Sequence, residues 1–363
     1  SLSNIPLFWT DPTTSSIIPE NRVYRHLLYT FYAFCWKIGG GSTVTFHLMK
    51  MVMHWGVALF LFLIWQKLWS RPNWWPLKGP LTLHFPFLRR PIELNHNGAA
   101  LLLAVVFAVH TTGSECVDYI SSTTSLQCAL FYLMAYWAYL SGRDTGSWKH
   151  LAFSLFAYFL SVASKEEGIT LLAMVFVTEI FLSKGTPKKV FERAVRTSLP
   201  YVAVGICLAF WLFVMHSTEG EESHGAVKPI HYFMTQWRAY LYYMGLWFWP
   251  WELNADSASW QFSTSVWDTR VLQAAIGNLA ILTVAWLKRS KYPALLFGVL
   301  WFYITISPAS SVVVLAEAVN DHRMYLAYIG FAGATATLVF HAMEAWVFEP
   351  FRALKVGTAV TLV

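Results

Sequence analysis

The segment that decides the fold class is 45–67, which reads TFHLMKMVMHWGVALFLFLIWQK. Its second half is an apolar run that is closed by Trp65 and Lys67. A helix of about 20 apolar residues is long enough to cross the hydrocarbon core of a bilayer, and aromatic and basic side chains favour the headgroup level at its ends. The segment therefore predicts a membrane-spanning helix.

Similar apolar runs recur along the whole chain. Of its 363 residues, 56% are apolar, 17% are aromatic and 13% are charged, whereas an ordinary soluble domain is ~25% charged. The candidate spans are 45–67, 97–112, 126–142, 149–164, 168–184, 198–217, 269–287, 293–308 and 324–346. Two further apolar helices contain basic residues among aromatic ones, so we expect them to be interfacial or re-entrant; they are 24–38 and 231–250.

The predicted fold class is therefore all-α, a polytopic membrane protein with about nine transmembrane helices and two interfacial or re-entrant helices. We expect a single domain over 1–363, with an extracytoplasmic segment at 1–44 and a transmembrane bundle at 45–346. The chain starts with a polar stretch and not with a signal peptide, so we expect one more helix upstream. The four cysteines show no metal-binding spacing and are predicted to be small buried residues, with a Cys116–Cys128 disulfide as the open alternative.

The distribution of charge predicts the orientation. Alternate loops hold the basic residues Lys67, Arg71, Lys78, Arg89, Arg90, Arg143, Lys149, Lys184, Lys188, Lys189, Arg193, Arg196, Lys288, Arg289 and Lys291. Such loops are cytoplasmic by the positive-inside rule, which explains the net charge of +6 without nucleic acid. The other loops hold Glu115, Asp118, Glu166, Glu167, Glu219, Glu221, Glu222, Glu252, Asp256, Asp268 and Asp321. We expect these to face a periplasm or lumen, and we predict an integral protein of a bacterial inner membrane.

Four polar clusters lie at span ends on the predicted extracytoplasmic side. They are Arg22 to His26, His110 to Asp118, Lys165 to Gly168, and Glu317 to Tyr325. Ionisable residues that converge on one membrane face indicate a site for a polar or anionic ligand. Each cluster alone has a simpler interpretation: interfacial charges of a helix hairpin for Lys165 and Glu166, contact with headgroups for Arg323, and a helix-end cap for His110.

His47, Lys50 and His54 share one face of the span 45–67. Two histidines with a lysine between them could form a metal or proton site, but no carboxylate lies nearby in sequence. We therefore interpret this face as one that packs against other helices or contacts lipid headgroups.

The order of these motifs resembles the membrane domain of the transmembrane and tetratricopeptide-repeat O-mannosyltransferases and their bacterial relatives, which are GT-C glycosyltransferases. The resemblance covers about 20–335. Its most specific parts are Lys165-Glu166-Glu167-Gly168-Ile169-Thr170 and Asn320-Asp321-His322-Arg323-Met324-Tyr325-Leu326. Weaker matches are Tyr24 to Leu27, Gly39 to Gly41, Phe46 to Lys50, His110 to Val117, Ser307 to Ser311, and Gly330 with Phe331.

The resemblance implies transfer of a sugar from a polyprenyl-phosphate donor to a protein or glycan acceptor, outside the cytoplasm. Cations would hold the phosphate, and a carboxylate would take the proton of the acceptor hydroxyl. The candidates for binding substrate or phosphate are Arg323, His322, Lys165, Glu166, Arg25 and His110. The candidate catalytic carboxylates are Glu115 and Asp321. No metal ligands are identified, and participation of a divalent cation stays open.

The chain also departs from the family pattern. The acidic pair that supplies the catalytic carboxylate in the superfamily would lie upstream of Ser1, the family proline is His26, and the family asparagine is Lys50. An Arg-Asp pair is replaced by Ser121 to Thr124, and no tetratricopeptide repeats follow. The alternative function is therefore a noncatalytic scaffold or assembly subunit of a larger membrane complex. A transporter is disfavoured because the chain has no inverted repeat.

Overall fold

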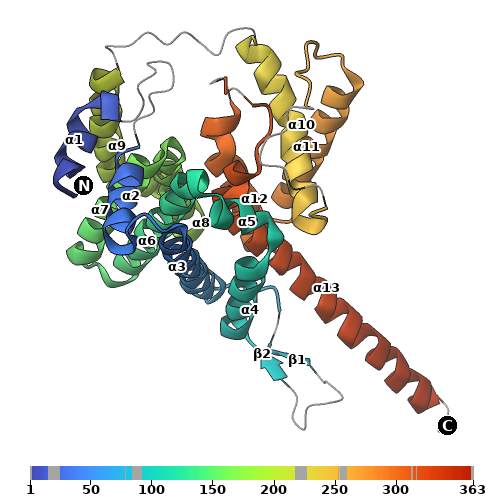
Figure 1. Ribbon diagram of the computed structural model, residues 1–363. Coiled ribbons are helices and arrows are strands. Elements are labelled where there is room, and N and C mark those ends of the chain that lie inside the picture. The colour runs from blue at the N-terminus through green and yellow to red at the C-terminus, as the bar shows by residue number, and fades with distance from the viewer. Residues whose placement is uncertain are drawn as a thin grey trace.

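The computed structural model describes residues 2–14, 25–77, 79–83, 92–216, 227–251, 253, 260–311, 314–315 and 317–360. Several charged residues of the predicted loops lie outside these ranges, namely Arg22, Lys78, Arg89, Arg90, Glu219, Glu221, Glu222, Glu252 and Asp256. In the described part the chain is almost entirely helical (Figure 1), which confirms the all-α class.

The first three helices are α1 (Ile5–Thr10), α2 (His26–Gly39) and α3 (Thr43–Trp69). Helix α2 corresponds to the predicted interfacial segment 24–38, and α3 to the span 45–67. Helix α2 packs against both α1 and α3. The N-terminal part of the chain therefore covers one end of the bundle.

Helix α4 (His96–Val109) begins at Asn95, whose side chain accepts hydrogen bonds from two backbone amides of the first turn. The predicted span 97–112 ends too late, because α4 stops at Val109 and the chain bends by 57° into the segment Thr111–Asp118. That segment contains the short helix α5 (Ser114–Asp118). The bend turns α5 across the end of the bundle.

Four helices follow as two hairpins: α6 (Thr123–Thr145) with α7 (Trp148–Ser164), and α8 (Leu171–Leu182) with α9 (Pro187–His216). A short 3-10 helix, Glu166–Thr170, joins α7 to α8. A Cβ atom at Gly168 would lie 2.7 Å from the backbone of Ser161, so only glycine allows this turn to close onto α7.

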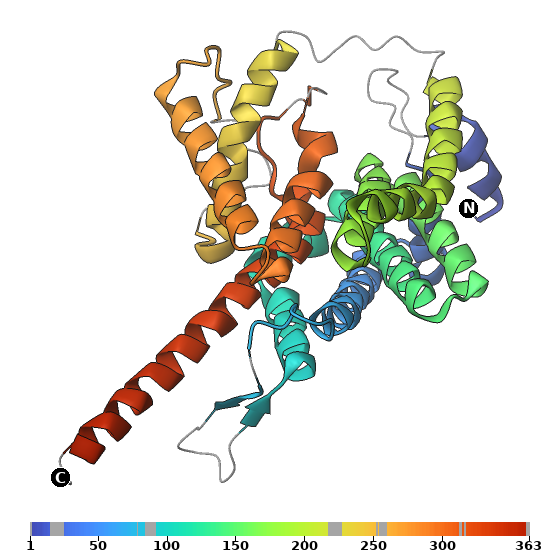
Figure 2. The ribbon, with the colours of Figure 1, turned by 180° about the vertical axis from the view of Figure 1, so that it is seen from behind.

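The last four helices are α10 (Pro229–Phe248), α11 (Thr269–Leu287), α12 (Pro293–Ile306) and α13 (Tyr325–Val360). Helices α10 and α11 form a pair on the flank of the molecule opposite to α1 and α9, as Figure 2 shows from behind. Helices α12 and α13 touch through their backbones, because a Cβ atom at Gly298 would overlap the carbonyl oxygen of Gly330.

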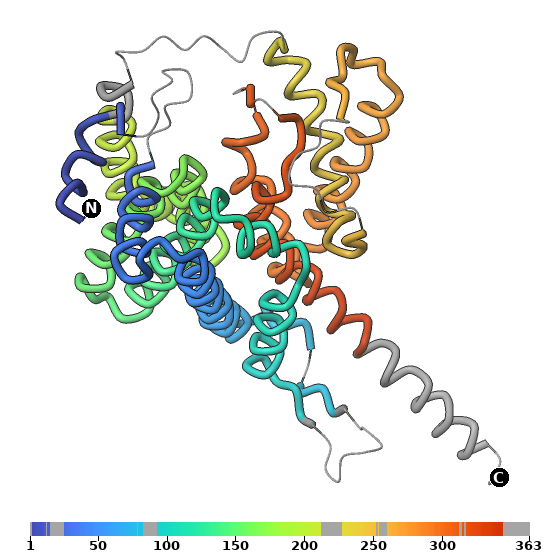
Figure 3. The backbone as a smooth tube through the Cα atoms, in the orientation of Figure 1, coloured from blue at the N-terminus to red at the C-terminus, as the bar shows by residue number. Residues whose placement is uncertain are grey.

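One small sheet departs from the all-helical prediction. Strands β1 (Leu81–Leu83) and β2 (Ile92–Leu94) form an antiparallel hairpin in which Leu81 pairs with Leu94. This hairpin lies near one end of α4, and α5 lies near the other (Figure 3). Hydrogen bonds between two strands are non-local, so the helical periodicity of the flanking spans did not reveal them.

Five helices of the described residues are long and apolar enough to cross a membrane, and the bent segment that contains α4 would make six. Helices α7 and α8 have 17 and 12 residues, so neither reaches the ~20 residues of a perpendicular span. The chain is thus an integral, polytopic membrane protein. The number of nine spans stays a prediction.

The cysteines are free thiols. Cys35, Cys116 and Cys128 are buried, as predicted, and the alternative of a Cys116–Cys128 disulfide is wrong. Cys207 is exposed on α9, so the expectation of burial is wrong for this residue.

Candidate functional site

Glu115 lies on α5, which the bend after α4 places across the end of the bundle. One of its oxygens, Oε1, lies 3.0 Å from Nδ1 of His322 and accepts a hydrogen bond of 3.3 Å from the hydroxyl of Ser122. Its other oxygen, Oε2, is buried and has no hydrogen-bond partner among the residues that the structure describes. Glu115 is therefore oriented by one oxygen, and the described residues leave the acceptor capacity of the other oxygen unused.

His322 lies in the 3-10 helix Asp321–Met324 that opens α13. The side chain of Asn320 caps this helix by accepting a hydrogen bond of 3.2 Å from the backbone N–H of His322. Residues 115 and 322 are far apart in sequence, yet they meet because α5 and this 3-10 helix lie against each other.

Lys165 lies in the turn between α7 and the 3-10 helix Glu166–Thr170. Its ammonium forms an ion pair of 2.8 Å with Glu167 and donates a hydrogen bond of 3.0 Å to the hydroxyl of Ser125. Burial raises the pKa of Glu167, and the charge of Lys165 lowers it in part. Because Lys165 and Glu167 are both buried, they are not the interfacial charges of a simple hairpin.

Glu166, the next residue of this motif, is exposed at the surface. Desolvation by the surrounding chain raises its pKa, but the charges of Lys165, and then of Arg25, lower it more, so that the net pKa lies below the ordinary value. Glu166 is therefore a charged carboxylate between two cations.

Arg323 is buried and already has internal partners. Its guanidinium lies 3.5 Å from a carboxylate oxygen of Glu317 and donates a hydrogen bond of 3.0 Å to the carbonyl of the same residue. A third contact, of 3.5 Å, joins it to the hydroxyl of Tyr232. These partners exclude the headgroup-contact interpretation of Arg323, and they satisfy much of the charge that we expected a phosphate to satisfy.

Among the described residues, Arg25 has far fewer hydrogen-bond and ion-pair partners than Arg323. It precedes α2 and donates one hydrogen bond of 3.1 Å, from a terminal nitrogen to the hydroxyl of Thr124. Its Nε is buried without a hydrogen-bond partner, and it forms no ion pair with any residue that the structure describes. Arg25 therefore has donors to spare for an anion.

These groups act on one another electrostatically. The charges of Lys165 and Arg323 act on Glu115 and Glu167, and the charge of Arg25 acts on Glu166 and His322. We call this group the charged cluster; it consists of Arg25, Glu115, Lys165, Glu166, Glu167, Glu317, His322 and Arg323. It contains more glutamates than cations, so an anion would be attracted by Arg25, which has no ion pair among the described residues, and not by the cluster as a whole.

Two further predicted site residues, His110 and Asp321, have surroundings of their own. His110 stacks on Trp247 with the ring centroids 4.2 Å apart, and its ring nitrogens bond Thr112 and the Trp247 carbonyl. It also caps the 3-10 helix Thr111–Gly113, as the simpler interpretation predicted. Asp321 is buried, and its charge acts on Tyr243 and Tyr328.

Lys50 has a role that sequence reasoning missed. It is fully buried, and its ammonium donates a hydrogen bond to the carbonyl of Tyr119, the residue that ends α5. His54, one turn further along α3, bonds the hydroxyl of Tyr325 and the carbonyl of Ala108. For Lys50 and His54, the interpretation as residues that pack inside the protein is right, and the interpretation as contacts to lipid headgroups is wrong. A lone lysine within an apolar span could have indicated this role, because charged residues inside a span almost always have a partner within the protein.

No group of three or more His, Cys, Asp or Glu side chains in the described ranges is arranged to hold a metal ion. We therefore assign no residue to the divalent cation that the sequence left open.

Sequence comparison relates the chain to transferases that act on proteins. Protein O-mannosyl-transferase TMTC4 of Homo sapiens is 27% identical over 183 residues, which are 48% of this chain and 23% of that protein. Protein O-mannosyl-transferase TMTC3 of Homo sapiens is 23% identical over 181 residues, 49% of this chain and 17% of that protein. The matched part thus spans less than a quarter of the length of either relative.

No family model matches the chain, and no solved structure matches it significantly. The mouse TMTC4 protein gives a third match, 26% identical over 184 residues. These matches confirm the relationship to the O-mannosyltransferase family that the loop motifs predicted.

Proposed function

We propose that this chain is the membrane domain of a glycosyltransferase that moves a sugar from a polyprenyl-phosphate donor to a hydroxyl of a protein acceptor, with a glycan as the alternative acceptor. The observation that carries the proposal is the charged cluster, in which segments from α2, α5, the α7–α8 turn and the start of α13 meet at one end of the bundle. The relationship to protein O-mannosyl-transferases supports this assignment. The cluster end would face away from the cytoplasm.

Glu115 is the carboxylate best placed to act on the acceptor. His322 and Ser122 hold its Oε1, and Oε2 has no hydrogen-bond partner in the described part of the chain. The acceptor hydroxyl would give its proton to Oε2 while its oxygen forms a bond to the anomeric carbon. The bond between that carbon and the phosphate oxygen breaks, and polyprenyl phosphate leaves with the bonding electron pair.

Arg25 is the first candidate for holding the departing phosphate. A guanidinium can donate two parallel hydrogen bonds to phosphate oxygens, and Arg25 has donors that the described residues do not use. Lys165, Arg323 and His322 lie in the same cluster and would contribute charge or hydrogen bonds at longer range. Glu166 would face the sugar hydroxyls because its side chain is exposed.

The test is a transfer assay with lipid-linked sugars and an acceptor peptide, using the purified full-length protein. Glu115→Gln should lower kcat by roughly a hundredfold or more, the usual contribution of a general base. The matched control is Asp118→Asn, because Asp118 is an exposed carboxylate of the same short helix. Both variants should unfold at the wild-type temperature.

Two results would overturn the proposal. A wild-type protein that transfers no sugar from any polyprenyl-phosphate donor would leave the scaffold function, which the internal Arg323–Glu317 pair favours. An active Glu115→Gln variant would show that another carboxylate takes the proton, and Asp321 would be the next candidate within this chain.

A further inference from the structure

The first turns of α9 carry a group of exposed basic side chains at one end of the bundle. From residue 184 to residue 196 the exposed charged side chains are Lys184, Lys188, Lys189, Glu192, Arg193 and Arg196. Arg193 forms an ion pair with Glu179 of α8 and keeps 57% of its side chain exposed. Lys189 and Arg196 form no ion pair with any residue that the structure describes. The positive charge of this segment is therefore only partly compensated by the described residues around it.

Three of these cations lie along one side of α9. Lys189, Arg193 and Arg196 are spaced by four and three residues, the spacing at which side chains are neighbours on a helix surface. Like charges at this spacing repel one another and destabilise a helix. We call these three residues the basic face. An anion from outside the chain would reduce this repulsion and accept hydrogen bonds from these side chains.

An exposed apolar row runs along α9 beside the basic face. Phe191, Val195 and Leu199 follow one another at intervals of four residues and are 56%, 39% and 55% exposed, so no helix of the described part covers them. We call these three residues the apolar stripe. Ile206 and Phe210, further along the same helix, are also exposed. Because the α9 segment Pro187–Trp211 is long and apolar enough to span a membrane, we expect the apolar stripe to contact lipid.

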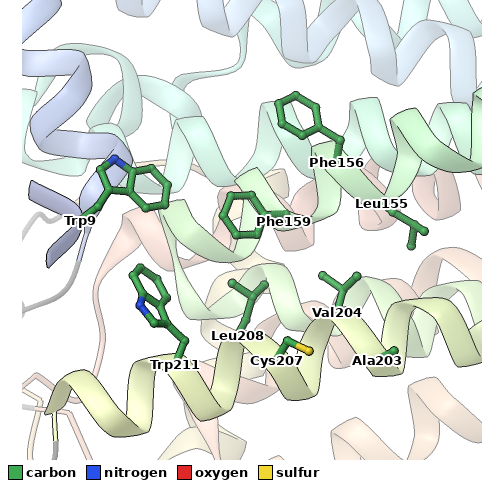
Figure 4. Close-up of a pocket in the computed structure, with 9 residues that line it drawn as sticks. All are labelled: Trp9, Leu155, Phe156, Phe159, Ala203, Val204, Cys207, Leu208 and Trp211. Atoms are coloured by element: carbon green, nitrogen blue, oxygen red, sulfur yellow. The ribbon is translucent and has the colours of Figure 1, made fainter. Parts of the chain in front are cut away.

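This exposed side of α9 differs from the side that the helix turns toward α7. In Figure 4, Val204 and Leu208 of α9 lie opposite Phe159 of α7 across an apolar pocket. Ile206 and Phe210 do not line that pocket. Helix α9 therefore packs toward α7 with one side and presents another side to its surroundings.

The apolar stripe indicates the depth of the basic face in the bilayer. Phe191 lies between Lys189 and Arg193 in the chain, so each of these cations is within one helical turn, about 5.4 Å, of an apolar side chain that we expect to touch lipid. Basic side chains at such a depth extend to the headgroups. Trp148, which begins α7 at the same end of the bundle, is 73% exposed, as is typical of an aromatic residue at the membrane interface.

We propose that the basic face and the apolar stripe together form a binding surface for acidic phospholipids of the surrounding bilayer. The phosphate of the headgroup accepts hydrogen bonds from the basic face, and an acyl chain lies along the apolar stripe. Arg193 keeps its ion pair with Glu179 and offers the exposed part of its guanidinium. The surface lies at the other end of α7 and α8 from Lys165, so the inference does not depend on the proposed function.

The surface combines a demand for negative charge with a demand for an apolar chain. The headgroup of phosphatidylglycerol has a net negative charge, and basic residues next to a membrane are attracted by such lipids. Phosphatidylcholine has a cation of its own beside the phosphate, so it gains less from the basic face. A soluble anion would leave the apolar stripe without a partner. An acidic phospholipid satisfies both parts of the surface with one molecule.

The experiment uses the purified full-length protein in phosphatidylcholine vesicles that contain a minor share of a photoreactive lipid. The lipid carries a diazirine in its acyl chain and is either phosphatidylglycerol or phosphatidylcholine. Mass spectrometry would map the adducts on the segment 187–199. We expect the phosphatidylglycerol adducts to exceed the phosphatidylcholine adducts roughly tenfold or more at low ionic strength. High salt should reduce this ratio, because it screens exposed charges.

The double variant Lys189→Gln with Arg196→Gln should bring the ratio close to one. The matched control is Lys288→Gln with Lys291→Gln, which removes two exposed lysines that lie outside α9 and should keep the wild-type ratio. Glu192→Lys tests the opposite direction, since it replaces the exposed acid of this segment by a cation and should raise the ratio. A rise cannot come from misfolding, so the test stays decisive if the double variant does not fold.

Three results would overturn the inference. Equal adducts from the two lipids on the wild-type segment would show contact with lipid but no selection for charge. A segment without adducts from either lipid would mean that another partner, such as a protein, covers it. A ratio that is the same in the wild type, the double variant and Glu192→Lys would show that the basic face does not select the lipid. Labelling needs no sugar transfer, so none of these results bears on the proposed function.

Discussion

Two carboxylates at opposite ends of the bundle, the buried Glu179 and the half-buried Glu115, have very different surroundings. Glu179 on α8 accepts hydrogen bonds from Tyr139, Ser183 and Arg143, and it forms a second ion pair with Arg193. Within the described ranges, hydrogen bonds reach one oxygen of Glu115, and its other oxygen is buried without a hydrogen-bond partner. A carboxylate whose lone pairs are all used stabilises the fold, whereas one with an unused oxygen is able to bind.

The cations differ in the same way. Arg143 and Arg193 both form ion pairs with Glu179, and these ion pairs link one end of α6 and one end of α9 to α8. Arg25 has one hydroxyl partner and no carboxylate among the described residues. Together with the proposed function, the comparison predicts stabilisation by the Glu179 end and ligand binding at the Glu115 end, and three substitutions can break or sharpen it.

The largest effect should come from Glu179→Gln. Removing this buried charge leaves the half-buried Arg143 without its ionic partner, and breaking a buried ion pair typically costs about 3–5 kcal/mol of unfolding free energy. Denaturant unfolding would measure the loss, while donor affinity should be unchanged. Glu192→Gln is the control, because Glu192 is exposed and its one ion pair among the described residues is with Lys188, at 4.0 Å. A Glu179→Gln protein as stable as this control would contradict the comparison.

Arg25→Gln should have the next largest effect. We expect it to lower the affinity for the donor and to leave the stability of the protein unchanged. Loss of a charge-assisted contact to phosphate costs about 2 kcal/mol or more, so donor affinity should fall roughly thirtyfold. Arg25→Lys should recover part of it, because lysine keeps the charge and lacks the bidentate fork. The measurement is a binding titration with polyprenyl phosphate beside a thermal melt. Weaker binding that is matched by a large loss of stability would make Arg25 a structural residue.

Asp144→Asn should have the smallest effect. Partial burial raises the pKa of Asp144, but hydrogen bonds and charge from Arg71, with Lys67, outweigh it and lower the net pKa below its ordinary value of 3.8. A carboxylate with a lowered folded-state pKa stabilises the protein above its unfolded pKa, and the contribution is lost as the pH falls through the folded value. Because Asp144 is partly exposed, we expect about 0.5–1 kcal/mol near pH 7.

Unfolding of the wild type and of Asp144→Asn at a series of pH values tests this prediction. The two curves should be separated at neutral pH and should converge in acid below about pH 4. A separation that stays constant down to acid pH would mean that the ion pairs contribute nothing to stability.

Helix boundaries were predictable where the chain itself sets them. The span 269–287 coincides with α11, because the Asp268 side chain caps its first turn and basic residues from Lys288 onward follow its end. The end of α4 was not predictable in this way. His110 leaves the helix and bonds Trp247, a partner 137 positions away that no local pattern reveals.

The candidate site was predictable as a set of residues but not as a set of partners. The motif order indicated that Glu115, Lys165, His322 and Arg323 are related, and the structure brings them into one cluster. Sequence reasoning preferred Arg323 as the phosphate ligand, since it could not show that Glu317 is already in contact with it. Arg25 lies beside Thr124 of α6 and Glu166 of the α7–α8 turn only because of the fold, so the sequence could not show how few partners it has among the described residues.

The backbone contact of α12 with α13 bears on how membrane thickness acts on this protein. Two helices that touch at Gly298 and Gly330 tilt together, so His322 and Arg323 follow the tilt of a two-helix unit. Arg25 precedes α2, which belongs to the other side of the cluster. A helix whose apolar stretch is longer than the hydrocarbon thickness of the bilayer tilts to fit it. Lipid chain length is thus a mechanical variable that changes the distance between the two sides of the cluster.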